Sequence, residues 1–161
     1  MAKVYLLLGG NLGDKIFFLE QASELIAKHI GSVIQKSSFY ESDAWGFESN
    51  DSFINQVLLI NTILSPDLLL EKIKSIEKSL GRVRGNVGYV SRTIDIDILF
   101  YDDIIVETET LSIPHKFLHE RMFTLAPLKE IASDFIHPQK KQTIHQLHEI
   151  CKDEVFVAKL N

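Results

Sequence analysis

The order of strand-like and helix-like patterns along the chain limits its possible folds more than any other feature. Compact apolar stretches at 4–8, 53–64 and 93–101 are typical of buried strands. Apolar residues recur at helical spacing over 15–29 and over 66–80. A strand, a helix, two or more strands, a second helix and further strands in this order predict an α+β fold with a mostly antiparallel sheet.

Capping residues indicate where the two helices begin and end. Asp14 can accept a hydrogen bond from the first turn of one helix, and Ser65 followed by Pro66 is a typical start for the other. Gly31 and Gly81 follow the last apolar positions and are expected to end the helices. The resulting split β-α-β order is close to that of a ferredoxin-like fold, which is the architecture that we expect.

Four shorter segments complete the expected fold. They are a strand over 34–40, a short strand or turn over 111–115, and helices over 121–132 and 143–151. Pro127 fits best near the first turn of its helix, because proline has no N–H to donate inside a helix. Thr143, with Gln146 three residues later, has the form of a capping box.

The composition indicates one globular domain over 1–161. The formal net charge of −5 argues against a protein whose main task is to bind nucleic acid, because phosphate contacts favour basic surfaces. Cys151 is the single cysteine, so no internal disulfide can form, and we expect a cytoplasmic protein. The apolar run before Gly9 is too short to span a bilayer, so we expect no membrane association.

The stretch RTIDIDILF, from Arg92 to Phe100, carries the clearest chemical signal. Strand side chains alternate between faces, so Asp95 and Asp97 should project to one side, about 7 Å apart at their Cα atoms. Two neighbouring carboxylates repel each other, and Mg²⁺ would relieve that repulsion. A solvent-exposed strand face would also tolerate the pair. The arginines before it favour a site for magnesium and a polyphosphate.

Two other segments allow two interpretations each, and a third allows one. The polar loop over 41–52 contains large aromatic residues, and it either pins itself to the surface or binds a ligand. The glycines at 9–13 suit either a phosphate loop or a tight turn between strand and helix. The segment 82–92 contains two glycines and three arginines, and we expect it to be exposed and mobile.

Seven segments in order give the chain a specific resemblance. They are YLLLGGNLGD, SSFYESDAWG, FINQV, IEKSLGRVR, SRTIDIDILFYDD, LSIPH and ERMFTLAPLKEI. With this spacing, from about Val4 to Ile131, the chain resembles the 6-hydroxymethyl-7,8-dihydropterin pyrophosphokinases. The resemblance implies a ferredoxin-like α+β fold with helices packed on a mostly antiparallel sheet and three mobile active-site loops. It also implies transfer of pyrophosphate from ATP to the pterin hydroxymethyl group, with release of AMP, in folate biosynthesis.

The resemblance also assigns roles to individual residues. Asp95 and Asp97 would hold two Mg²⁺ ions on the ATP phosphates. The pterin would lie between the rings of Phe53 and Phe123, and Asn55 would read its polar edge. The remaining pterin contacts would come from Ser42, Ala44 and Trp45. ATP would contact Lys74, Glu77, Arg84, Arg92, Ile98, Ser112, His115 and Arg121.

Arg82 and Arg92 would close onto the phosphates as catalytic residues, excluding water from the reaction. Gly85, Gly88 and Val90 depart from the family pattern, as does Lys74, which stands where relatives often carry Gln or His. Gly85, Gly88 and Val90 lie in the 82–92 loop, and none of these departures changes the expected class of reaction.

Two other functions compete with this interpretation. A nucleic-acid-binding module on the same topology would stack bases on sheet aromatics, and tight, salt-sensitive RNA binding would support it. A nucleotide-binding protein without turnover would bind ATP but form no AMP. The acidic charge argues against the first, and the complete set of carboxylates and pterin residues argues against the second. Both small substrates are expected to bind a monomer.

Overall fold

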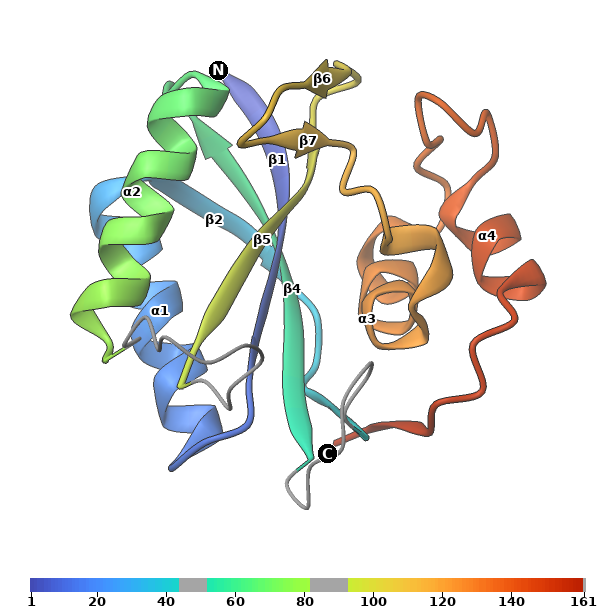
Figure 1. The fold of residues 1–161 in the computed structure, drawn as a ribbon, viewed down its shortest axis with the longest axis horizontal. Helices are drawn as coiled ribbons and strands as arrows, with labels where there is room; N and C mark the ends of the chain where they lie inside the picture. Colours follow the sequence, from blue (N-terminus) through green and yellow to red (C-terminus); the bar gives the residue numbers. More distant parts are fainter. Residues whose placement is uncertain (44–51, 82–92, 161) are drawn as a thin grey trace.

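The computed structural model describes residues 1–43, 52–81 and 93–160. Within these residues the chain forms a twisted sheet with helices on both faces (Figure 1). The sheet strands are β1 (Ala2–Gly10), β2 (Gly31–Lys36), β3 (Tyr40–Ser42), β4 (Phe53–Thr62), β5 (Asp95–Tyr101) and β8 (Val157–Lys159). No helix in the described part of the chain has the length and apolar character needed to cross a membrane.

The strand order confirms the ferredoxin-like expectation. The strands are hydrogen-bonded in the order β5-β1-β4-β3-β8, and β2 also pairs with β4. Each of these pairings is antiparallel. A separate two-stranded sheet pairs β6 (Val106–Glu107) with β7 (Ser112–Ile113). The chain therefore forms a split β-α-β arrangement. In chain order it consists of β1, α1, the strands β2 and β3 with their partner β4, then α2 and β5.

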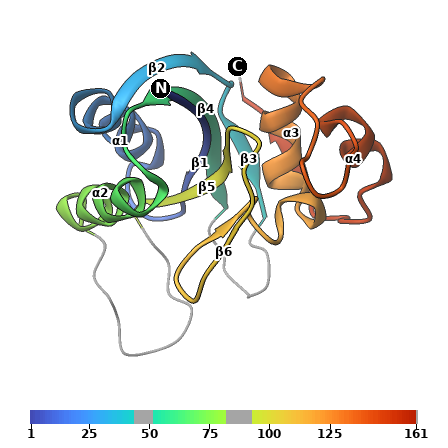
Figure 2. The same ribbon diagram turned by 90° about the horizontal axis from the view of Figure 1, so that it is seen from above.

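The helices divide between the two faces of the sheet, as the view from above shows (Figure 2). One face carries α1 (Lys15–His29) and α2 (Pro66–Ser79), and the other carries α3 (Met122–Ala132) and α4 (Ile144–Ile150). A 3-10 turn, η1 (Leu118–Glu120), precedes α3. Each face has its own core, because alternate residues along β1 point in opposite directions: Leu6 and Leu8 belong to the α1–α2 core, and Leu7 to the α3–α4 core.

The predicted helix caps are present. The Asp14 side chain accepts a hydrogen bond from Phe17 N at 3.1 Å, and Thr143 and Gln146 form the reciprocal bonds of a capping box. Gly31 does not end α1, however. It is the first residue of β2, where a Cβ atom would collide with the backbone oxygen of Asn61.

The single strand expected over 34–40 is wrong, because the chain forms two strands that both pair with β4. The break falls at Ser37, whose hydroxyl accepts a hydrogen bond from Val57 N at 2.9 Å. The Ser37 backbone N–H donates to Val57 O, also at 2.9 Å. A side chain thus replaces one backbone bond of the ladder, and the chain shifts before β3 begins at Tyr40.

Pro127 lies inside α3 and not in its first turn. Its side chain is buried, as are those of Leu125 and Leu128, which belong to the α3–α4 core. Packing of this apolar helix offsets the backbone hydrogen bond that proline cannot make.

Candidate active site

The residues expected to bind the pterin and the metal lie on one face of the sheet, the face toward α3. Ile96 and Ile98 belong to the α1–α2 core, so Asp95 and Asp97 point to the opposite side. By the same alternation, Ile54 packs toward α1 and α2, which places Phe53 and Asn55 on the α3 side. Asp95 and Asp97 thus share one side of β5, and Phe53 and Asn55 share one side of β4, as strand alternation predicts. Both sides face α3.

Gly9 lies between the proposed pterin residues on β4 and the aspartates on β5. It pairs with Asn55 on β4 and with Asp95 on β5, because β1 is the strand between them. Two strand spacings separate Asn55 from Asp95, which is about 10 Å at the Cα atoms. A Cβ atom on Gly9 would collide with Asn55 Oδ1, so the absence of a side chain leaves room for the amide. Gly9 and Gly10 lie within β1, and the tight turn between strand and helix spans residues 11–14, where Gly13 has a φ of 64°.

Asn55 is held by its neighbour on β3. Its Nδ2 donates to the Ser42 hydroxyl at 3.2 Å, and the two residues are 3% and 1% exposed. Ser42 pairs with Phe53 in the register of β3 and β4. The buried contact fixes the orientation of the Asn55 amide, which leaves its oxygen directed toward the space above Gly9.

The backbone between the two aspartates is anchored from α2. Glu77 is 4% exposed, and its Oε2 accepts a hydrogen bond from Ile96 N at 2.9 Å. A bulge follows at Leu99, which the pairing of Tyr5 with Phe100 and of Leu6 with Ile98 leaves without an opposite residue. The bulge turns both Leu99 and Phe100 into the α3–α4 core. Beyond the aspartates, this face of β5 is therefore apolar.

His115 reaches Asp97 from the loop after β7. Its Nε2 lies 3.9 Å from Asp97 Oδ2, and its backbone N–H donates to Leu99 O at 3.0 Å. Nδ1 accepts from Phe117 N at 3.2 Å, so the neutral ring carries its proton on Nε2. Burial, and next the positive charge of Arg121, lower the pKa of His115 to about 4, although Asp95 acts in the opposite direction. At neutral pH the ring is an uncharged N–H donor beside the carboxylates.

Arg121 lies at the start of α3 and is flanked by two aromatic rings. Its guanidinium carbon is 5.0 Å from the centre of the Phe117 ring and 5.5 Å from that of Phe123. These cation–π contacts hold the cation on the His115 side of the site, where its charge influences the imidazole. They also fix Phe123, which faces the sheet from α3.

The donor groups in this part of the site suit Mg²⁺. Asp95 and Asp97 supply hard carboxylate oxygens, and the Asp97 side chain keeps 30% of its surface exposed. Among the described residues, no group of three His, Cys, Asp or Glu side chains could hold a metal ion. Two carboxylates without a full protein cage are what Mg²⁺ uses when substrate phosphates and water complete its coordination.

The remaining expected ATP residues have different surroundings. Lys74 is exposed on α2. The Ser112 hydroxyl donates to Glu107 Oε1 at 2.7 Å within the β6–β7 pair. The Ile98 side chain is 5% exposed and lies in the α1–α2 core, so this residue could meet a nucleotide only through its backbone. Ala44, Trp45, Arg82, Arg84 and Arg92 lie outside the described residues.

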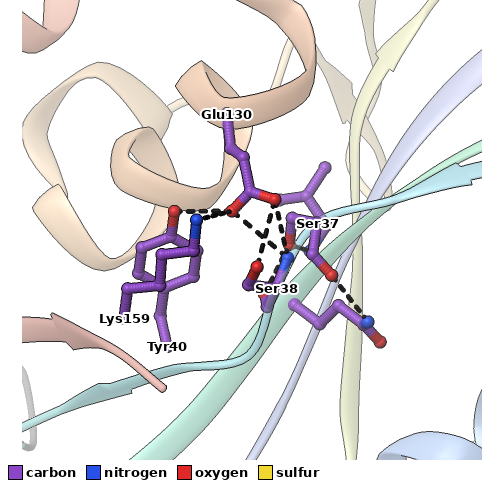
Figure 3. Close-up of polar contacts among 7 residues, drawn as sticks. Ser37, Ser38, Tyr40, Glu130 and Lys159 are labelled. Atoms are coloured by element: carbon purple, nitrogen blue, oxygen red, sulfur yellow. Dashed lines mark hydrogen bonds and ion pairs between the residues drawn. The ribbon is translucent and has the colours of Figure 1, made fainter. Parts of the chain in front are cut away.

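A polar cluster that the sequence did not reveal joins α3 to β3, as Figure 3 shows. Glu130 accepts hydrogen bonds from the Tyr40 hydroxyl at 2.7 Å and from Ser38 N at 3.0 Å, and it lies 3.9 Å from Lys159 Nζ. Burial, together with the hydrogen bond to Glu130 and its charge, raises the pKa of Tyr40. The cluster ties the helix that carries Phe123 to the strand that carries Ser42.

Comparison with known proteins decides the family. The family model described as 7,8-dihydro-6-hydroxymethylpterin-pyrophosphokinase (HPPK) matches residues 5–133. The chain belongs to this family. A 2-amino-4-hydroxy-6-hydroxymethyldihydropteridine pyrophosphokinase of Aquifex aeolicus is 45% identical over 86% of this chain and 85% of its own. The protein of the same name in Bacillus subtilis is 44% identical over 79% of this chain and 76% of its own.

Solved structures support the same fold. The HPPK-DHPS protein of Plasmodium falciparum with pteroate matches with a TM-score of 0.75 at 18% identity. The match covers 92% of this chain and 44% of that one, so the chain spans less than half the length of this protein. At this identity the likeness concerns the arrangement of strands and helices. The antiparallel sheet with helices packed on it is thus an HPPK arrangement.

Proposed function

We propose that this chain is a transferase that moves pyrophosphate from ATP to 6-hydroxymethyl-7,8-dihydropterin in folate biosynthesis. The pterin hydroxymethyl oxygen would form a bond to the β-phosphorus of ATP. The bond from that phosphorus to the α,β-bridging oxygen would break, and AMP would leave. Membership of the HPPK family supports this reaction, because curated relatives that match most of the chain carry the name of this pyrophosphokinase.

One observation carries the proposal. Asn55 and Asp95 flank Gly9 on the same sheet face, so an amide that can read a flat heterocycle lies about 10 Å from a carboxylate pair. A hydroxymethyl group on the heterocycle and a phosphate held at the carboxylates would meet between them. Holding two substrates in this orientation is the main contribution that a protein makes to phosphoryl transfer.

For the pterin, we assign stacking to Phe53 and Phe123 and edge recognition to Asn55 and Ser42. The Asn55 amide both donates and accepts, and Ser42 occupies one of its donors. The rotation of the Asn55 side chain is therefore restricted before the substrate binds, which reduces the conformational entropy lost on binding. Ala44 and Trp45 are proposed to complete the pterin site, on the family resemblance alone.

For the nucleotide, we assign phosphate contacts to His115 and Arg121. The neutral imidazole can donate from Nε2 to a phosphate oxygen, and the guanidinium supplies a positive charge already fixed by two rings. Lys74, Glu77, Ser112 and the backbone at Ile98 are proposed to surround the rest of ATP. Glu77 would act partly by holding the strand at Ile96. On the family resemblance, we also propose that Arg84 binds ATP and that Arg82 and Arg92 act as catalytic residues.

Asp95 and Asp97 are the residues that would hold magnesium. When bound, Mg²⁺ neutralises phosphate charge and orients the triphosphate, and we propose two ions. The two aspartates keep their carboxylates on one face because β5 alternates regularly up to Ile98.

We also propose that the chain is a single domain over 1–161 that works as a cytoplasmic monomer without nucleic acid or membrane partners. Its acidic charge and single cysteine support that view.

Release of AMP from ATP tests the proposed function. The purified chain is incubated with ATP and Mg²⁺, with and without 6-hydroxymethyl-7,8-dihydropterin, and AMP is quantified by chromatography. We expect AMP only when pterin and metal are both present. ATP binding without AMP formation would favour a nucleotide-binding protein without turnover. Salt-sensitive RNA binding, with no AMP, would favour the nucleic-acid module.

A further inference from the structure

The C-terminal segment contacts the proposed pterin site although it lies beyond residues 5–133, the part matched by the family model. Asp153 Oδ2 accepts a hydrogen bond at 2.9 Å from the backbone N–H of Met122, the first residue of α3. Its other oxygen, Oδ1, accepts from Val155 N at 3.0 Å, which fixes the carboxylate. A residue 31 positions away therefore caps the helix.

The position of this cap is informative because of its neighbours. Met122 stands between Arg121 and Phe123, and those two side chains contact each other at 5.5 Å. A carboxylate at a helix N-terminus satisfies a backbone donor and interacts favourably with the helix dipole. It restricts the first turn of α3, and hence the direction in which Phe123 and Arg121 leave the backbone.

The same C-terminal segment also contacts β3, the strand that carries Ser42. After Asp153 the chain forms β8, which pairs with β3 so that Val157 lies opposite Ser42. The Asp43 backbone N–H donates to Phe156 O at 3.3 Å. Ser42 in turn accepts from Asn55. A short stretch of chain thus contacts both the helix start and the strand that carry the proposed pterin residues.

We propose that Asp153 is a positioning residue for pterin binding, which acts through Phe123 by capping α3. The inference rests on the proposed function, because it concerns how the pterin is held. Asp153 does not touch substrate in this arrangement. It sets the angle at which the Phe123 ring meets the pterin, so Asp153 acts on the site through α3.

A double-mutant cycle distinguishes positioning from general stabilisation. The pterin Kd is measured by calorimetry with an ATP analogue that cannot be cleaved, for Asp153→Ala in the native background and in Phe123→Ala. Loss of a cap should raise the Kd about five- to tenfold in the native background. In the Phe123→Ala background the rise should be less than about twofold, because the ring that Asp153 positions is gone. Equal rises in both backgrounds, or no rise in either, would overturn the proposal.

Matched variants separate charge, geometry and stability. Asp153→Asn retains an acceptor that can cap the helix and should restore a Kd within about twofold of the native value. Asp134→Ala removes an exposed carboxylate at the other end of α3 and should leave the Kd unchanged. Thermal unfolding by circular dichroism shows whether each variant is folded, and Asp153→Ser enters the same cycle if the alanine variant is not.

Measurements on the wild-type chain distinguish failure of the positioning role of Asp153 from failure of the proposed function. If it binds pterin and forms AMP while Asp153→Ala binds pterin equally well, the positioning role is wrong and the proposed function stands. If the folded wild-type chain neither binds pterin nor forms AMP, the proposed function is wrong and the inference is overturned with it.

Discussion

Gly9 and Asn55 are paired across β1 and β4, and the Asn55 Oδ1 fills the space that a side chain at position 9 would need. A glycine inside a strand usually marks a close approach of another group. Here that group is the amide proposed to read the pterin edge. The same glycine pairs with Asp95 on its other side, so it adjoins both halves of the site.

Gly9→Ala should therefore displace the Asn55 amide and weaken pterin binding. Overpacking of this kind costs about 1–3 kcal/mol, which corresponds to a rise in pterin KM of roughly 5- to 150-fold. The KM for ATP should change much less, because the added methyl group meets Asn55. In the Asn55→Ala background the same substitution should add little, and steady-state kinetics of the four proteins would measure this. Additive effects would contradict the assigned contact.

Asp97→Asn should remove most of the activity without unfolding the protein. The amide keeps the volume of the side chain but loses the negative charge proposed to hold Mg²⁺, so AMP formation should fall by at least about a hundredfold. Asp103→Asn, an exposed carboxylate just after β5, is the matched control and should remain active. AMP release in a magnesium titration is the measurement. Near-native turnover of Asp97→Asn at low magnesium would refute the metal role.

The protein should lose stability as the pH falls from about 6.5 to about 4. Burial, followed by nearby positive charges, lowers the pKa of His137 to about 4, and His115 has a similarly lowered pKa. In this window the unfolded chain binds protons that the folded chain does not, so protonation favours unfolding. Urea unfolding at pH 7 and pH 5 should show a difference of about 2–4 kcal/mol, summed over the two histidines.

His137→Asn isolates one of these two contributions. His137 Nδ1 accepts hydrogen bonds from Gln139 N at 3.1 Å and from Lys140 N at 3.0 Å, and an asparagine oxygen can accept from the same turn. The variant should therefore keep the turn and lose part of the difference in stability between pH 7 and pH 5. If the difference is unchanged, the buried His137 is not one of its sources.

Glu130→Gln should destabilise the protein, because Glu130 forms the polar cluster that connects α3 with β3. Partial burial would raise the pKa of Glu130, but hydrogen bonds from Tyr40 and Ser38 and the charge of Lys159 hold it below its ordinary value. Loss of the charge should cost about 1–3 kcal/mol in the free energy of unfolding, and Tyr40→Phe about 1 kcal/mol. The double variant should be less destabilised than the sum, because both changes remove the 2.7 Å bond.

The pH dependence of this cluster provides a further check. A folded pKa below the unfolded value gives stability that is present above the unfolded pKa and is lost as the pH falls through the folded pKa. Wild type should therefore lose more stability than Glu130→Gln when the pH is lowered through the acidic range in which carboxylates titrate. Parallel stability curves for the two proteins would contradict the lowered pKa.

Local sequence patterns predicted much of this molecule. Residues close in the chain set the start of α1 at Asp14, the start of α2 at Ser65 and the alternation of Asp95 and Asp97, because caps and strand faces depend on neighbours a few positions away. The same patterns missed the break at Ser37, where a hydroxyl pairs with a strand 20 residues later. They also misplaced Pro127, which lies inside α3, a helix stabilised by burial of Leu125 and Leu128 in the core.

By itself the sequence determined the order of the elements, the faces of the strands and the residue types available for a pterin, a polyphosphate and magnesium. Only the tertiary structure decided that Gly9 makes room for Asn55, that His115 is neutral beside Asp97, and that Asp153 caps α3. The first and third relationships join residues 46 and 31 positions apart, and the second depends on burial, so no local pattern predicts any of them. Their energies arise only when the folded sheet brings such groups into contact and removes them from water.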